Sequence, residues 1–158
     1  METVLASAIA VLGTLLGSIT TITLQQRTAQ KAEQRTALAA AAAKLAHALS
    51  THRGHLYRRW ELAQPDTSTT PDELEAARRT SHASRDTVTG PLYQLRALTT
   101  DQELIRLAVA AVDAAYAVKR KGEDLASVSA ADIAARRDWG IAADHALLAA
   151  VAERVAPR

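Results

Sequence analysis

The chain of 158 residues contains no cysteine and no phenylalanine, and aromatic residues make up only 3% of it. Without cysteine, neither a disulfide framework nor a thiol-based metal or redox site is possible. No stretch alternates Val, Ile and aromatic residues with polar ones at the two-residue period of a strand. Alanine dominates instead, so we expect an all-α protein whose core consists of small side chains on closely packed helices.

The motifs of common enzyme classes are also missing. The sequence has no GxxxxGK[ST] loop, no GxGxxG after a strand, no nucleophile elbow, and no acidic set for a di-metal site in a bundle. His52 and His55 are spaced as two metal ligands on one helix face can be, but no second pair has a suitable spacing. We therefore interpret them as structural or solvent-facing histidines, and we expect no enzyme, no metal site and no cofactor.

The longest uncharged stretch runs from Thr3 to Gln26. A helix needs about 20 apolar residues to cross a hydrocarbon layer of about 30 Å, and the residues from Leu5 to Leu24 supply that length. Glu2, not a basic residue, precedes the stretch, which is untypical of a signal peptide. The sequence therefore predicts an uncleaved membrane anchor over residues 1–26; the alternative is a buried helix of a soluble bundle.

Basic residues follow this stretch and predict how it is oriented. Arg27, Lys31, Arg35 and Lys44 are opposed only by Glu33. By the positive-inside rule, the residues after the anchor lie in the cytoplasm. We therefore expect a single-pass protein of the cytoplasmic (inner) membrane with a cytoplasmic C-terminal domain.

Small residues within the predicted anchor form a candidate surface for helix association. Gly13, Gly17 and Thr21 recur every fourth residue, which lets two helix backbones approach closely in lipid. This pattern predicts a homo-oligomer, although glycine is common in membrane spans and a single GxxxG also arises by chance.

The remaining residues, 27–158, predict a cytoplasmic antiparallel helical bundle in which the anchor continues into the first helix. We expect helices at about residues 27–63, 71–98, 101–126 and 130–156. Capping boxes are expected at Thr70 and Thr100, and Ser129 is expected to start the last helix. The predicted inner face of the first helix repeats at spacings of three and four residues and comprises Leu38, Ala42, Leu45, Leu49, His52, Leu56 and Arg59 or Trp60.

Clusters of basic residues suggest contacts with phosphate groups. If the bundle gathers them on one face, they could hold DNA non-specifically or contact lipid headgroups; the alternative is a solvated face interleaved with acidic residues. The candidate contacts are Arg53, Arg58, Arg59, Lys119, Arg120 and Lys121.

Several motifs resemble those of the actinobacterial (Streptomyces) KilB-like family. They comprise the apolar run Ile9–Ser18, the Tyr57–Trp60 segment, the Leu92–Leu104 pattern and the Ala111–Ala115 segment. The resemblance spans most of the chain. It implies a membrane-associated protein without an active site that assists conjugative plasmid DNA transfer or the spread of plasmids between mycelial compartments.

We therefore expect a non-enzymatic, oligomeric, membrane-anchored accessory protein of plasmid transfer, whose partners are the membrane, other copies of itself, DNA and other transfer proteins. Two alternatives remain open. One is a membrane-tethered signalling or protein-interaction module unrelated to DNA. The other is a growth-inhibiting, pore-forming membrane protein.

Overall fold

The computed structural model describes the backbone of residues 2–156 and the side chains of residues 25–156. All regular structure in the described chain is helical, which confirms the predicted all-α class. The helices are α1 (Glu2–Leu62), α2 (Pro71–Leu98), α3 (Gln102–Tyr116), the short 3-10 helix η1 (Leu125–Ser127) and α4 (Ala130–Val155). The chain divides into two compact units, Met1–Thr36 and Ala37–Arg158, and α1 continues through both.

The first unit is helical, and its described side chains from residue 25 onward are mostly exposed. Arg27, Lys31 and Glu33 are among these exposed residues. These charges disfavour hydrocarbon around residues 27–33, because each one costs several kcal/mol to bury in lipid.

The predicted membrane localisation needs correction. Within the described part of the chain, no helix is long and apolar enough to cross a membrane. This finding contradicts the expectation of a single-pass protein of the cytoplasmic membrane. The stretch that prompted it, residues 5–24, lies outside the residues whose side chains the structure describes, as do Gly13, Gly17 and Thr21.

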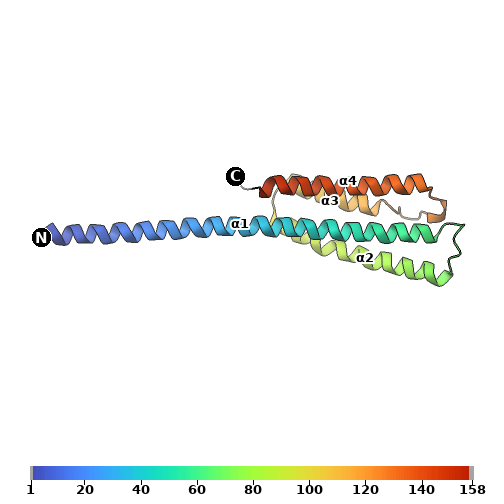
Figure 1. Ribbon diagram of the computed structural model, residues 1–158, viewed down its shortest axis with the longest axis horizontal. Coiled ribbons are helices and arrows are strands. Elements are labelled where there is room, and N and C mark those ends of the chain that lie inside the picture. The colour runs from blue at the N-terminus through green and yellow to red at the C-terminus, as the bar shows by residue number, and fades with distance from the viewer. Residues whose placement is uncertain (1, 157–158) are drawn as a thin grey trace. The chain divides into compact units, whose positions relative to one another are not determined.

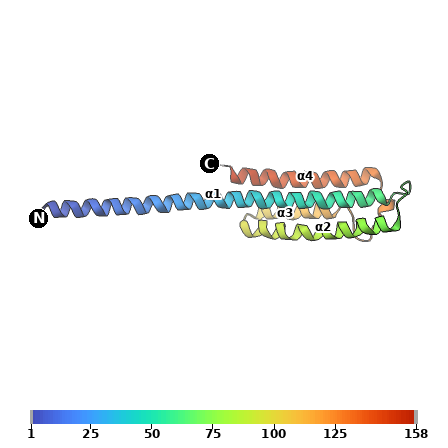
Figure 2. The same cartoon turned by 60° about the horizontal axis from the view of Figure 1, so that its bottom comes forward.

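The second unit is a bundle in which α2, α3 and α4 lie alongside the part of α1 from Ala37 to Leu62 (Figures 1 and 2). The predicted inner face of α1 is confirmed, since Leu45, Leu49 and Leu56 are almost completely buried. One cluster packs Leu45 and Leu49 against small side chains of α3, including Ala108, Ala111 and Ala115. Alanines at these contacts allow helices to pack closely, and the bundle therefore needs few large residues.

Helix ends are fixed by side-chain caps. Thr70 and Glu73 form the predicted capping box at the start of α2, and Ser129 caps α4. The box expected at Thr100 is wrong: Asp101 caps α3, because its carboxylate accepts from the amides of Glu103 and Leu104. An aspartate at this position satisfies two of the unpaired amides of the first turn by itself.

The connection between α3 and α4 is longer than the sequence predicted, because α3 ends at Tyr116 and not near residue 126. Gly122 has a positive φ of 78°, a conformation that favours glycine and turns the chain away from the helical path. Beyond the turn, Leu125 and Val128 pack in a second cluster with Leu56 and Trp60. The indole of Trp60 donates a hydrogen bond to the carbonyl of Val128 at 2.9 Å, which ties this connection to α1.

Candidate functional site

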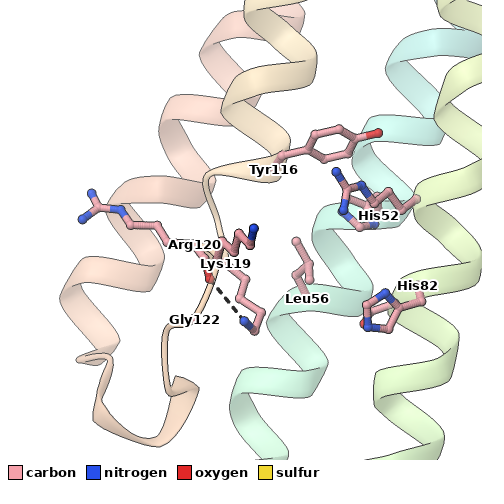
Figure 3. Close-up of a pocket in the computed structure, with 10 residues that line it drawn as sticks. His52, Leu56, His82, Tyr116, Lys119, Arg120 and Gly122 are labelled. Carbon is pink, nitrogen blue, oxygen red and sulfur yellow. Dashed lines mark hydrogen bonds between the residues drawn. The ribbon is translucent and has the colours of Figure 1, made fainter.

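A hollow lies where this connection meets α1 and α2. This basic cleft has a volume of about 450 Å³ (Figure 3). Its walls come from three parts of the bundle: α1, α2, and the end of α3 with the residues that follow it. The residues that line it are His52, Leu56, Ser81, His82, Arg85, Tyr116, Lys119, Arg120, Lys121 and Gly122.

The charge of the basic cleft is of one sign. Four of the ten lining residues are Arg or Lys, and the lining contains no Asp or Glu. Glu123, the next residue along the chain, is bound by Arg136 through two hydrogen bonds of 2.7 and 2.8 Å. The Arg136 guanidinium lowers the pKa of Glu123 to about 2. Arg136 is therefore the main partner of this carboxylate, and the backbone amide of Arg120 also donates to it at 3.0 Å.

His52 is an uncharged part of the cleft wall. Burial, together with the nearby positive charge of Arg85, lowers its pKa to about 4. The Ser84 hydroxyl donates its one proton to the Ser81 carbonyl at 2.9 Å. It therefore accepts the hydrogen bond that links it to Nδ1 of His52, also at 2.9 Å. The proton on Nδ1 leaves Nε2 as the acceptor nitrogen of the neutral ring.

Two planar groups lie beside this histidine. The Arg85 guanidinium from α2 sits over the ring of Tyr116, with 4.7 Å from its central carbon to the ring centroid. The same tyrosine ring meets the His52 ring edge to face, at 5.3 Å between centroids and 85° between planes. Together with Leu56, these groups give the cleft flat, weakly polar walls next to its cations.

The structure brings together part of the predicted set of phosphate contacts. Lys119, Arg120 and Lys121 follow α3 and line the basic cleft, and Lys119 also borders a second hollow that includes Arg59. The amine of Lys119 donates to the carbonyl of Arg120 at 3.2 Å (Figure 3). In the same view the side chain of Arg120 extends away from His52 and His82, toward the outside of the cleft.

The other predicted contacts lie elsewhere. Arg58 is exposed and pairs with Glu61 at 3.3 Å, outside the basic cleft. Arg53 is only 4% exposed, and its guanidinium is bound to Asp144 of α4. Arg53 is therefore part of the interior of the bundle, whereas Lys119, Arg120 and Lys121 are accessible or partly accessible.

Several further basic residues of the bundle are paired with neighbouring carboxylates. Arg78 and Arg79 both contact Glu75, and Arg106 is bound to Glu103. Trp60 is buried in the second cluster, whereas Trp139 is 55% exposed on α4. Sequence reasoning missed Arg85, Tyr116 and His82 as parts of the cleft. Each is an ordinary residue of its own helix, so only the packing of α2 against α3 reveals the group.

The fold and the cleft define a small all-helical protein with a basic cleft. Comparison with known families shows which one: residues 39–155 match the KilB plasmid transfer protein family, and the chain belongs to it. Protein KilB of Streptomyces lividans is 36% identical over 149 residues, which cover 92% of this chain and 95% of that protein. The resemblance detected in the sequence is thereby confirmed. No solved structure matches the chain.

Proposed function

We propose that this protein is a non-enzymatic accessory factor of plasmid DNA transfer that holds DNA through its phosphate groups. The observation that carries the proposal is the lining of the basic cleft, where four cations gather without a carboxylate among them. Membership of a plasmid transfer family supports DNA as the anion. Phosphate contacts give affinity without sequence selectivity, which suits a protein that accompanies any plasmid sequence.

One cation of the cleft and one cation of the second hollow are suited to a duplex backbone. Arg120 extends away from the cleft interior (Figure 3). Arg59 and Lys119 line the second hollow together with the acidic residues Glu75, Glu123 and Asp124. Burial and the nearby Arg78 lower the pKa of Arg59, so an additional anion is favourable beside it. We therefore assign DNA contact to Arg59, Lys119 and Arg120, with Arg58 as a further contact on α1.

Titration of labelled duplex DNA with the full chain, at several salt concentrations, tests this proposal. Binding is expected to be independent of sequence, and the logarithm of the binding constant falls linearly with the logarithm of salt concentration. The double variant Arg59→Glu/Arg120→Glu is expected to bind every sequence more weakly, with a salt slope lower by about two. The control Lys44→Glu/Arg96→Glu makes the same charge change at exposed residues outside the cleft.

Two results would overturn this assignment. One is the absence of DNA binding by the wild-type chain at low salt. The other is an equal loss of binding in both double variants, since net charge alone would then account for it. Either result favours the alternative of a protein-interaction module unrelated to DNA. Self-association through Gly13, Gly17 and Thr21 stays a prediction, and light scattering of the full chain with both glycines changed to Leu tests it.

A further inference from the structure

The interior of the basic cleft differs chemically from its cationic rim. Leu56, the Tyr116 ring and the neutral His52 ring contribute flat or apolar lining (Figure 3). The Arg85 guanidinium lies over the ring of Tyr116. A volume of about 450 Å³ lies within the range of pockets that hold small organic ligands, about 300 to 1,000 Å³. A phosphate ion alone would leave most of this interior unfilled.

The residues fit a ligand that has both an anionic and a planar part. The cations of Lys119, Lys121 and Arg85 attract phosphate oxygens, and Arg85 can pair with two of them at once. The partly exposed Tyr116 ring offers surface to an aromatic base, since every base has a face that stacks. Nε2 of His52 is a hydrogen-bond acceptor, which suits an amino group or a sugar hydroxyl.

We propose that the basic cleft binds one nucleoside 5′-phosphate, with the phosphate at Arg85 and Lys119 and the base against Tyr116, near Nε2 of His52. The site goes beyond the backbone contact proposed above, because it recognises a whole nucleotide and uses Arg85, which is not among the residues assigned to duplex contact. The nucleotide comes either from solution or from the 5′-phosphorylated end of a DNA strand. Both sources present the same chemistry to the cleft.

Isothermal titration calorimetry of the full chain at low salt separates the parts of this recognition. Deoxyadenosine 5′-monophosphate is expected to bind with one site per chain. Deoxyribose 5-phosphate lacks the base, and deoxyadenosine lacks the phosphate; each is expected to bind at least about tenfold more weakly, since both halves contribute. Equal affinity for deoxyribose 5-phosphate and the nucleotide would overturn the proposal, as would no saturable binding of the nucleotide up to millimolar concentrations.

Substitutions at Arg85 test the assigned position. Arg85 is exposed on α2, so its replacement is not expected to unfold the bundle. Arg85→Glu should lower the affinity for deoxyadenosine 5′-monophosphate by at least about tenfold, and Arg85→Lys should lower it less because the charge remains. Arg96→Glu, at an exposed position of the same helix outside the cleft, is the matched control. If Arg85→Glu and Arg96→Glu bind the nucleotide equally well, the cleft is not the site.

Two further comparisons distinguish the source and separate this proposal from DNA-backbone contact. The first comparison uses one oligonucleotide with and without a 5′-phosphate as competitor of the free nucleotide. If only the phosphorylated form competes, the strand end is a ligand of the cleft. If neither competes, the free nucleotide is the ligand. The Arg58→Glu/Arg59→Glu variant, whose residues do not line the basic cleft, should retain nucleotide binding while it loses duplex binding. Loss of both in that variant would contradict a separate nucleotide site.

Discussion

The guanidinium of Arg53 on α1 is hydrogen-bonded to the carboxylate of Asp144 on α4, and their side chains are only 5% and 8% exposed. The pair links two helices inside the bundle. One nitrogen of the guanidinium, Nη1, and one oxygen of the carboxylate, Oδ1, have no hydrogen-bond partner among the described residues. Such a pair is costly to break from one side, because the remaining charge stays buried and uncompensated.

We therefore expect Asp144→Ala to lower the free energy of unfolding by about 3 to 5 kcal/mol, because Arg53 would keep a buried charge. The double variant Arg53→Met/Asp144→Leu removes both charges and should recover most of this loss. Urea denaturation, monitored by circular dichroism, measures the free energy of unfolding of both variants. A single variant as stable as the wild type would show that the pair is not buried as described.

Gly140 offers a second test of the same contact. A Cβ atom at residue 140 would lie 2.8 Å from Cδ of Arg53, whereas at Gly54 nothing lies within 4 Å of an added Cβ. Gly140→Ala should therefore destabilise the bundle by about 1 to 3 kcal/mol, because Arg53 must shift away from Asp144. Gly54→Ala is the matched control and should stabilise α1 by up to about 1 kcal/mol. If both variants gain stability, the close approach at Gly140 does not exist.

His52 predicts how stability depends on pH. Its pKa is about 4 in the folded chain and 6.5 when unperturbed, so between these values the unfolded chain binds more protons. Stability should therefore fall as the pH drops from about 6.5 to about 4, by at most about 1.4 kcal/mol per pH unit. His52→Gln should remove this part of the pH dependence, and the exposed His82→Gln should not. Denaturation curves recorded between pH 4 and pH 6.5 measure this change in stability. The same pH dependence of stability in His52→Gln and in the wild type would contradict the prediction.

The sequence predicts the helices and their inner faces better than the contacts between them. The seam through Ala42, Leu45 and Leu49 follows from a spacing of three and four residues, and the structure buries all three. Asp144 lies four residues after the buried Gly140, on the same seam of α4. An acid at such a position is a signal for a buried partner, but the spacing does not identify Arg53 as that partner.

The basic cleft could be predicted only in part. Lys119, Arg120 and Lys121 are adjacent in the sequence, so their cluster is evident without a structure. Arg85 and Tyr116 meet because α2 packs beside α3, and no local pattern encodes that contact. The turn at Gly122 was also ambiguous, since a glycine inside a helical pattern either ends the helix or is absorbed into it.

The central claim is that the cations around the basic cleft serve plasmid transfer, and transfer itself tests it most directly. The frequency of transfer to a recipient strain would be measured for a plasmid whose KilB gene is replaced by the gene for this chain. We expect Arg59→Glu/Arg120→Glu to lower the frequency to that of a plasmid without the gene, and Lys44→Glu/Arg96→Glu to leave it unchanged at equal protein levels. Normal transfer by a folded, normally expressed Arg59→Glu/Arg120→Glu variant would contradict the account.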